Sequence, residues 1–383
     1  MFNEYKRLLK VQKESHLLRK PEIICNRQGK YVDAGKKRLI NFASNDYLGL
    51  CSDKKIKQIF SKNFQKYPCS SSSSRVVCGN YSVVLEAEKN FADFFGYEDC
   101  LFFQSGFQAN LALMSTIFLK NQSVLADKHI HASSIMGLKL GGVPFKTYNH
   151  NKISHLRKRL DKLNGKSCWV ITESLFSMDG DVLDVDNFFK LKEEFGFFSV
   201  VDEAHSVGAM GKEGRGITTG RADIVVGTFT KAFGFFGAFI LLPSVLKEYM
   251  FNFAAPLIYS TALPPAHAAC AIEILDVVKD FEDRRWYLQE LSLFARENLK
   301  TAGIPFVGES YLLSINIGNE SLAQEVAREL FSRNYMVFCS RHPTVPLGKS
   351  ILRLSLCYFH TDKDIDKFVK NLQDVLFKYG ILK

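Results

Sequence analysis

The chain has 383 residues, of which 46% are hydrophobic and 23% are charged. This composition is ordinary for a globular protein and excludes disorder and collagen-like repetition, and the length predicts two or three structural units at about 150 residues per domain. Lysine and arginine number 50 against 40 aspartates and glutamates, a formal net charge of +10. Because the basic excess forms no dense run, an anionic small molecule or a phosphorylated cofactor suits it as well as nucleic acid.

The nine cysteines are scattered and show neither a C-x-x-C pair nor a zinc-ligand spacing, which predicts reduced thiols in a cytoplasmic protein. Two uncharged stretches, 100–119 and 249–272, are interrupted by polar residues or prolines, so we expect no membrane-spanning helix. The first 20 residues are basic and amphipathic without the apolar core of a signal peptide, which predicts a surface helix.

Short β-rich segments alternate with amphipathic helical patterns between residues 100 and 242. Strands are expected at 100–103, 123–126, 168–172, 197–201, 223–227 and 237–242, and helices at 107–119, 153–163 and 185–195. Most of these strands are apolar throughout, as in strands that are covered on both faces. The β-α-β order predicts an α/β domain with a mostly parallel sheet flanked by helices.

The pattern changes after the Pro264–Pro265 turn. A helical region at about 266–301 precedes short strands at 312–318, 337–340 and 352–356 and a final helix at 361–379. We therefore expect three parts: an N-terminal helix and arm (1–40), a large α/β domain (41–265) and a smaller C-terminal α+β domain (266–383).

Polar residues follow five of the predicted strands, and ligands of open α/β sheets bind at the carboxyl ends of the strands. Gly106 and Phe107 lie in a small-residue turn that opens a helix, which suits a phosphate group. The other strand ends carry His129 and His131, Ser177, Asp202 and His205, and Thr228 and Lys231.

Each of these features has a simpler explanation when taken alone. A glycine at such a place is usually only part of a turn, and a single aspartate or lysine is more often a helix cap or a solvated charge. His129 and His131 are spaced like a metal pair, but no further ligand cluster accompanies them, so we predict no metal.

Taken together, the strand-end residues match the needs of pyridoxal 5′-phosphate (PLP). This cofactor requires a lysine for covalent attachment, an acid at its pyridinium nitrogen, a phosphate site and a group against its ring. Asp202 and Lys231 are 29 residues apart, which suits the ends of successive strands. The sequence therefore predicts a PLP enzyme.

Seven segments occur in an order and at separations typical of one enzyme family: NFASNDYLGL (41–50), SRVVCGNYSVV (74–84), FFQSGFQAN (102–110), ESLFSMDGD (173–181), VDEAHSVGAMGKEGRG (201–216), TFTKAFGFFGA (228–238) and PTVPLG…LRLSL (343–356). With these segments the chain resembles the α-oxoamine synthases, which are PLP enzymes of fold type I, from about Leu17 to its C-terminus. The resemblance implies the fold-type I architecture, with a large PLP-binding α/β domain and a smaller α+β domain.

The resemblance also implies roles at the cofactor ring. Lys231 would hold PLP covalently and act as acid and base at the substrate Cα. Asp202 would pair with the pyridinium nitrogen, and His131 would stack on the ring and contact the substrate. His205 and Ser177 would lie near the phenolic oxygen of the ring.

Further roles concern the phosphate and the substrates. Gly106, Phe107 and Thr228 would hold the cofactor, mainly through its phosphate. Arg353 and Asn45 match the amino-acid carboxylate site.

Two further matches, Arg19 and Thr344, correspond to positions that contact the acyl substrate. The chain departs from the family at Ser70–Ser73, where glycines are usual, and at Ile351, where many relatives have an arginine.

The implied reaction is the decarboxylating condensation of L-alanine with pimeloyl-CoA, or with pimeloyl-acyl carrier protein, in biotin biosynthesis, carried out by a homodimer. Family members that use glycine with acetyl-CoA or succinyl-CoA, or serine with a long acyl chain, remain alternatives, because acyl preference depends on pocket shape. An inactive relative is disfavoured by the intact Lys231, Asp202 and His131.

A nucleic-acid helicase is the main alternative from another class, because residues 202–205 spell a DEAH box. Such an enzyme also needs G-x-x-x-x-G-K-[ST] upstream to bind phosphates. Gly165–Ser167 has Leu160 in place of the first glycine, and Gly348–Ser350 lies downstream. The helicase motif is therefore incomplete, and we expect no nucleic-acid partner. We also expect no membrane partner, because no membrane-spanning helix is predicted.

Overall fold

The computed structural model describes residues 2–382, and the chain divides into two compact units. The first unit comprises the residues up to 52, residues 177–181 and the residues from 286 onward. The second unit comprises residues 53–176 and 182–285.

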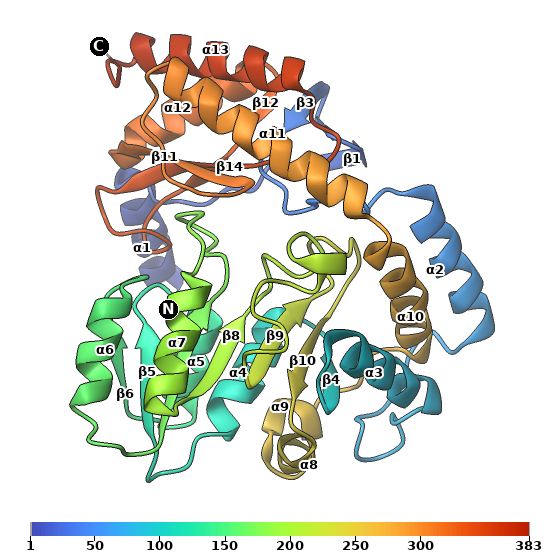
Figure 1. The fold of residues 1–383 in the computed structure, drawn as a ribbon. Helices are drawn as coiled ribbons and strands as arrows, with labels where there is room; N and C mark the ends of the chain where they lie inside the picture. Colours follow the sequence, from blue (N-terminus) through green and yellow to red (C-terminus); the bar gives the residue numbers. More distant parts are fainter. Residues whose placement is uncertain (1, 383) are drawn as a thin grey trace. The chain divides into compact units, whose positions relative to one another are not determined.

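The second unit is built on a seven-stranded sheet (Figure 1). Its strands are β4 (Asp99–Phe103), β5 (Ser123–Asp127), β6 (Phe145–Tyr148), β7 (Cys168–Glu173), β8 (Phe198–Asp202), β9 (Ile224–Thr228) and β10 (Ala238–Leu242), in the spatial order β4-β10-β9-β8-β7-β5-β6. Neighbouring strands are parallel except β10, which is antiparallel to both β4 and β9. This confirms the predicted α/β class with a mostly parallel sheet.

Six of these strands begin and end within one residue of the predicted bounds, and β6 was not predicted. The central strands β7, β9 and β10 are buried along their whole length, which explains their continuous apolar sequences. Strand β6 has only one fully buried residue and lies at the edge of the sheet, so its sequence lacks the apolar run that identified the others.

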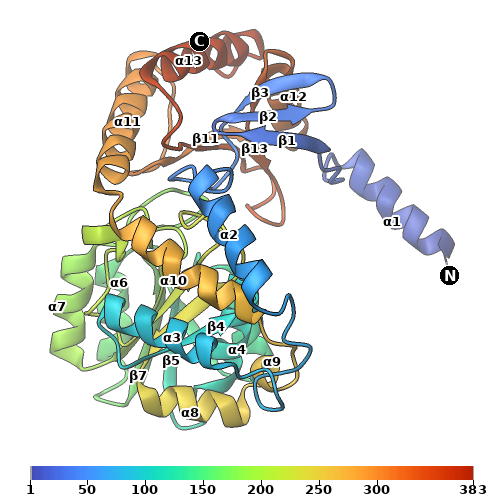
Figure 2. The ribbon, with the colours of Figure 1, turned by 90° about the vertical axis from the view of Figure 1, so that its right-hand side faces the viewer.

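Helices cover both faces of the sheet. One face packs on α4 (Gly106–Thr116), α5 (Ala132–Leu140), α8 (Ser244–Phe253) and α9 (Ala255–Ile258) in a single apolar core. The other side carries α3 (Ser82–Phe95), with α10 (Pro265–Lys279) against it and α2 (Lys54–Lys66) beside α10 (Figure 2). The helices predicted at 153–163 and 185–195 are observed as α6 (Ile153–Asp161) and α7 (Val185–Phe195).

A cluster of phenylalanine rings joins α3 to the sheet. The ring of Phe91 meets those of Phe102, Phe229 and Phe239 edge-on, at centroid distances of 5.2, 5.3 and 5.1 Å. Such pairs add about 0.5–1.5 kcal/mol each to the effect of area burial. Phe229 follows directly after β9, so the cluster also anchors the turn that begins there.

The observed division differs from the expected domain boundaries. Residues 266–285 belong to the second unit because α10 packs on α2 and α3. The Pro264–Pro265 pair begins a helix, for which proline at the first position is well suited, and does not separate domains.

The first unit contains two small sheets. In one, β1 (Ile24–Gln28), β2 (Tyr31–Ala34) and β3 (Lys37–Asn41) form antiparallel pairs, and β3 pairs in parallel with β12 (Tyr335–Met336). In the other, the order is β11 (Leu312–Gly318), β14 (Ser350–Ser355), β13 (Phe338–Ser340). Residues 24–41 therefore share a sheet with a C-terminal strand and do not form a separate arm.

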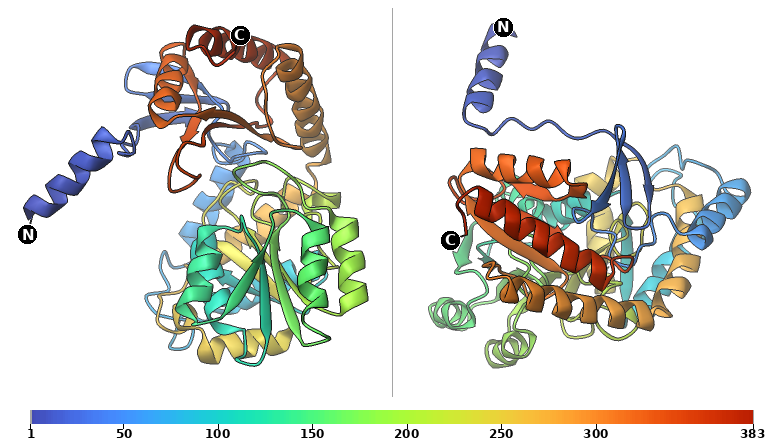
Figure 3. Two further views of the ribbon diagram at one scale, coloured as in Figure 1. Left: turned by 90° about the vertical axis from the view of Figure 1, so that its left-hand side faces the viewer. Right: turned by 90° about the horizontal axis from the view of Figure 1, so that it is seen from above.

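The first unit also contains α11 (Glu282–Thr301, within this unit from residue 286), α12 (Glu320–Ser332) and α13 (Asp362–Lys378). Helices α12 and α13 lie side by side (Figure 3). The predicted N-terminal surface helix is α1 (Phe2–Glu14), which has no buried residue. Among residues 2–382, no helix is both long enough and apolar enough to cross a membrane.

The phenylalanine cluster gives a prediction about stability. Phe91 is fully buried, so Phe91→Ala should lower the free energy of unfolding by about 3–5 kcal/mol, measured by urea denaturation. The control is Phe253→Ala, at a side chain that is 63% exposed, for which we expect a change within about 0.5 kcal/mol. A loss below about 1 kcal/mol for Phe91→Ala would contradict the assigned role of the cluster.

Candidate active site

The buried carboxylate of Asp202 lies at the carboxyl end of β8 and is 8% exposed. Its Oδ1 accepts a hydrogen bond from the main-chain N–H of Ala204 (2.9 Å), and its Oδ2 accepts one from Asn110 Nδ2 (2.7 Å). Burying a charge in this way is unfavourable unless a cation is paired with it. These two neutral donors orient the carboxylate without neutralising its charge. The carboxylate is therefore suited to pair with a protonated ring nitrogen.

His131 is the N-cap residue of α5, and its ring is held from the helix side. Its Nδ1 lies 2.7 Å from Ser133 Oγ and accepts a hydrogen bond from the Ser133 main-chain N–H (3.3 Å). Burial lowers the pKa of His131, the charge of Lys231 lowers it further, and the charge of Asp202 opposes them. The imidazole is therefore held toward its neutral form, in which it can lie flat against an aromatic ring.

Glu173 ends β7 and fixes the main chain at His131. Its Oε1 accepts a hydrogen bond from the His131 main-chain N–H (2.6 Å), and it pairs with Asp202 in the β7–β8 register. Burial and the charge of Asp202 raise the pKa of Glu173 well above its ordinary value, while Lys231 opposes the shift. This second carboxyl is therefore held toward its neutral form, so it adds little negative charge beside Asp202.

Lys231 stands in a closed turn between β9 and β10. Within this turn the Phe229 N–H donates to Gly237 O (3.0 Å), the Phe235 N–H donates to Phe229 O (3.0 Å), and the Gly234 N–H donates to Lys231 O (3.1 Å). Because Phe229 also belongs to the phenylalanine cluster, the turn is fixed to the core. The lysine is thus presented on a rigid support.

The residues predicted to hold the phosphate lie at the start of α4. Ser105 caps the Gln108 N–H (3.2 Å), and the first N–H groups of a helix, here those of Gly106 and Phe107, have no partner within it. Thr228 is close by, since a Cβ placed on Gly106 would lie 4.0 Å from Thr228 Oγ1. These N–H groups and the positive end of the helix are suited to a phosphate.

These features fit PLP on the geometry of the second unit alone. It contains an oriented buried carboxylate, a neutral imidazole, a rigidly supported lysine and a helix N-terminus with a threonine beside it. His205, which is 8% exposed, follows Asp202 in the same unit. The predicted cofactor residues that lie in this unit are Gly106, Phe107, His131, Asp202, His205, Thr228 and Lys231.

The first unit holds the predicted amino-acid site. Arg353, on β14, is 3% exposed; its Nε donates to Ser177 O (2.5 Å) and its Nη2 donates to Asn45 Oδ1 (2.9 Å). Burial lowers the pKa of Arg353, and neighbouring Tyr47 opposes that shift. Neutral acceptors orient the guanidinium without neutralising it, so it keeps the charge that a carboxylate ligand requires.

The residues predicted to contact the acyl substrate also lie in the first unit. The exposed Arg19 donates from Nη2 to His342 O (3.2 Å), two residues before Thr344. The Thr344 N–H donates to Arg341 O (3.0 Å) in the same segment. The structure therefore brings Arg19 and the Thr344 segment together.

Ser177 differs from the other predicted cofactor residues in its position. It belongs to the first unit, where its carbonyl oxygen orients Arg353. Its main chain thus belongs to the predicted amino-acid site, which the sequence did not indicate.

Three side chains of the site were missed by the sequence analysis: Asn110, Ser133 and Glu173. Asn110 carried a weak signal, because it is one of four polar residues in the mostly apolar helical pattern at 107–119. Glu173 also carried one, since it ends an apolar strand. Ser133 has no such signal, because its importance comes from the approach of α5 to α4.

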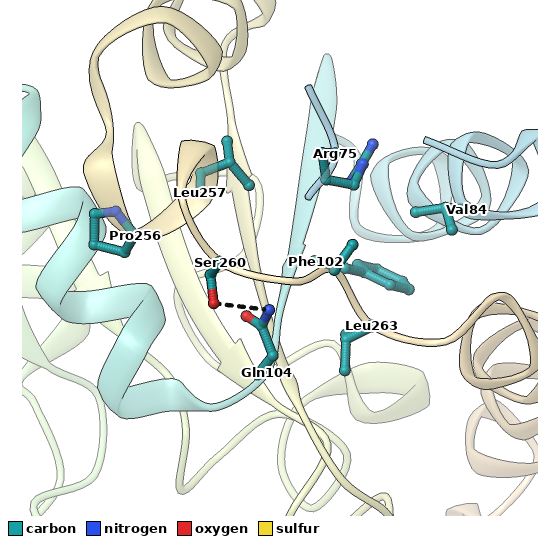
Figure 4. Close-up of a pocket in the computed structure, with 9 residues that line it drawn as sticks. Arg75, Val84, Phe102, Gln104, Pro256, Leu257, Ser260 and Leu263 are labelled. Atoms are coloured by element: carbon teal, nitrogen blue, oxygen red, sulfur yellow. Dashed lines mark hydrogen bonds between the residues drawn. The ribbon is translucent and has the colours of Figure 1, made fainter. Parts of the chain in front are cut away.

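The serine run is hydrogen-bonded to residue 262, and a small cavity lies beside this contact. Ser71 Oγ donates to Ala262 O (2.8 Å), and the Ala262 N–H donates to Ser73 O (2.8 Å). Figure 4 shows the cavity beside Gln104, whose Nε2 donates to Ser260 Oγ (3.4 Å). The volume of this cavity is about 10 Å³, which is room for one water at most.

Ile351, the second departure, lines a larger cavity within the first unit. This cavity has a volume of about 310 Å³, and its other walls include Phe306, Val345 and Pro346. Ile351 is two residues before Arg353 and therefore on the same face of β14. An apolar wall thus stands close to the predicted amino-acid site.

Comparison with known proteins identifies the family of this chain. The family described as Aminotransferase class I and II matches residues 37–372. A protein of Haemophilus influenzae (strain 86-028NP), described as "Putative 8-amino-7-oxononanoate synthase", is 37% identical over 355 residues, covering 89% of this chain and 93% of its own length. A protein of Neisseria meningitidis (strain FAM18) with the same description is 36% identical over 360 residues, with 91% and 94% covered.

Solved structures agree with this placement. The 8-amino-7-oxononanoate synthase of Francisella tularensis matches with a TM-score of 0.77 at 33% identity, covering 90% of this chain and 99% of that one. The serine palmitoyltransferase of S. paucimobilis, with bound PLP and myriocin, matches with a TM-score of 0.91 at 25% identity, covering 100% and 98%.

The chain belongs to the aminotransferase class I and II family. Within that family it is a PLP-dependent α-oxoamine synthase, an enzyme of the acyltransferase type. The predicted cofactor and enzyme class are thereby confirmed.

The turn that carries Lys231 gives a prediction about pH. Buried His267 contacts Phe236 O in this turn through Nε2, and burial lowers the pKa of its imidazole to about 4. An unfolded histidine binds a proton near pH 6.5, so the stability contributed by neutral His267 is present above that pH and is lost as the pH falls toward 4.

Between pH 7 and pH 5, wild-type protein should therefore lose on the order of 2 kcal/mol more stability than His267→Gln, measured by urea unfolding at each pH. Glutamine keeps a donor for Phe236 O but does not titrate. His360, whose pKa burial also lowers to about 4, is common to both proteins and cancels. Equal losses in the two proteins would show that His267 is not the group responsible.

Proposed function

We propose that this enzyme condenses L-alanine with a pimeloyl thioester, carried by CoA or by acyl carrier protein, to form 8-amino-7-oxononanoate and CO2. The observation that carries this choice is the 36–37% identity, over about nine-tenths of the chain, to relatives with the corresponding description. The site geometry supports the reaction class, and the relatives support the substrates. We also propose a cytoplasmic homodimer, which follows from the family resemblance.

PLP, when bound, withdraws electrons from the substrate Cα and so makes its proton removable. In the proposed mechanism Asp202 keeps the ring nitrogen protonated, which sustains this withdrawal. His131 covers the ring as a neutral group, so it adds no positive charge that would compete with the ring nitrogen for Asp202. Lys231 first holds the cofactor and, once displaced by the amino acid, is the base that takes the Cα proton.

Arg353 binds the carboxylate of L-alanine through its charged guanidinium, and Asn45 fixes the guanidinium plane. Holding the carboxylate restricts which bond at Cα is activated, and this orientation accounts for part of the rate enhancement. A bond forms between Cα and the thioester carbonyl carbon, and the thiol leaves. The former alanine carboxylate departs as CO2, and Lys231 returns a proton to Cα.

A second candidate is the condensation of L-serine with a long acyl-CoA. It is favoured by the likeness to serine palmitoyltransferase, which covers the whole chain at a TM-score of 0.91. The sequence identity of that match is 25%, against 37% for the relative described as an 8-amino-7-oxononanoate synthase. The alanine reaction is therefore the main proposal.

Thiol release separates the two candidates. PLP-loaded enzyme is offered L-alanine, glycine and L-serine, each with pimeloyl-, acetyl-, succinyl- and palmitoyl-CoA and with pimeloyl-acyl carrier protein. We expect release to be fastest with L-alanine and a pimeloyl donor, and Lys231→Ala to reduce it by about 10³-fold or more. Fastest release with serine and palmitoyl-CoA would establish the second candidate, and fastest release with glycine would reject both.

The carboxylate site gives a separate prediction. Arg353→Lys keeps the charge but loses the planar fork, so KM for L-alanine should rise about 10- to 100-fold while cofactor binding is unchanged. The matched control is Arg333→Lys, in the same unit, where the guanidinium binds Glu329 (3.2 Å) and Asn371 (3.2 Å). An unchanged KM in the Arg353 variant, or an equal rise in the control, would remove Arg353 from the substrate site.

A further inference from the structure

Asn110 is a buried polar residue at the point where α4, α5 and β8 approach one another. It is 2% exposed, and its Nδ2 donates to Asp202 Oδ2 (2.7 Å) and to Ser133 Oγ (3.1 Å). An ionised carboxylate can only accept hydrogen bonds, so the amide nitrogen of Asn110 must face Asp202. Both amide hydrogens are then used, one on each partner.

This orientation of the Asn110 amide fixes the direction of the hydrogen bonds between Ser133 and His131. Because Ser133 Oγ accepts from Asn110, its own hydrogen is available for His131 Nδ1, which lies 2.7 Å away. The Ser133 main-chain N–H is directed at the same nitrogen (3.3 Å). His131 Nδ1 is therefore an acceptor, and the neutral ring carries its hydrogen on Nε2. One chain of hydrogen bonds thus joins the side chains of Asp202 and His131.

Close packing of the two helices makes this chain possible. Gly137, on α5, leaves no room for a side chain, since a Cβ there would lie 2.7 Å from Met114 Cβ and 3.0 Å from Asn110 O. Ser133 is one helical turn earlier on the same face of α5. The glycine contact therefore brings the Ser133 hydroxyl within reach of the Asn110 side chain.

We propose that Asn110 is a positioning residue that, directly and through Ser133, holds Asp202 and His131 in one fixed arrangement at the cofactor ring. The proposal rests on the roles proposed above for Asp202 and His131. It does not depend on which amino acid or acyl thioester the enzyme uses.

The first test compares Asn110→Ala with Asn63→Ala. Asn63 is a matched control, because it is 3% exposed in the same unit and its Nδ2 also donates to a carboxylate, Glu273 (2.8 Å), and to a second acceptor, Ile59 O (3.0 Å). The measurements are the dissociation constant of PLP and the visible circular dichroism of the bound cofactor, which reports how rigidly its ring is held.

We expect Asn110→Ala to weaken PLP binding about 10- to 100-fold and to reduce the visible circular dichroism per bound PLP. Asn63→Ala should lower the thermal midpoint but leave both cofactor measurements unchanged within about twofold. Equal effects of the two substitutions on PLP binding would overturn the proposal, since Asn110 would then act only through general stability.

A double-mutant cycle shows whether Asn110 acts through Asp202. Asp202→Asn alone should weaken PLP binding, and adding Asn110→Ala to it should weaken binding by less than about twofold more. An undiminished effect of Asn110→Ala in the Asp202→Asn background would overturn the positioning role. If Asp202→Asn alone leaves PLP binding unchanged, the assignment of Asp202 is wrong and the inference falls with it.

Ser133→Ala provides an independent variant should Asn110→Ala not fold. It removes the link to His131 but keeps the Asn110–Asp202 bond, so the visible circular dichroism should fall while PLP binding weakens by less than about threefold. Wild-type circular dichroism in folded, PLP-loaded Ser133→Ala would overturn the proposed link through Ser133.

Discussion

The structure of the second unit is organised around one unfavourable placement, the burial of a carboxylate at the end of β8. The Asp202 carboxylate, at 8% exposure, requires donors, and the main chain and α4 provide them through Ala204 and Asn110. A buried carboxylate also requires a cation, and in the role proposed for Asp202 the ring nitrogen of PLP would be that cation. The parallel sheet makes this placement possible, because its strands end together at one edge and point their last side chains to the same region.

The elements around Asp202 place few other charges at this edge of the sheet. Burial favours the neutral forms of His131 and Glu173, two titratable groups whose pKa values the charge of Asp202 also affects. Lys231 is carried on a turn that the phenylalanine cluster anchors to the core through Phe229. Stability and chemistry are therefore linked, since the aromatic contacts that stabilise the sheet also hold the lysine in place.

Sequence patterns identified the strands of this site because buried parallel strands are apolar along their length, and they identified the residues that follow those strands. They missed β6, whose exposed edge position removes the apolar signal. They placed a boundary at Pro264–Pro265, whereas α10 remains with the second unit through its packing on α2 and α3. They also missed Ser133, because the approach of α5 to α4 at Gly137 is a tertiary contact that no local pattern encodes.

The adjacent acids of the DEAH segment show why motif letters alone do not define a function. Glu203 is completely buried and accepts hydrogen bonds from the Thr218 N–H (2.6 Å), the Thr218 hydroxyl (2.5 Å) and the Ile217 N–H (3.1 Å). These donors bind residues 217–218 to the end of β8, so Glu203 is occupied in holding a loop. Asp202, one residue earlier, points to the opposite side of the strand end and is oriented by Asn110. The same four letters that mark a nucleotide-binding acid in helicases here divide into a structural acid and an acid suited to a pyridinium nitrogen, and the difference lies in which donors surround each one.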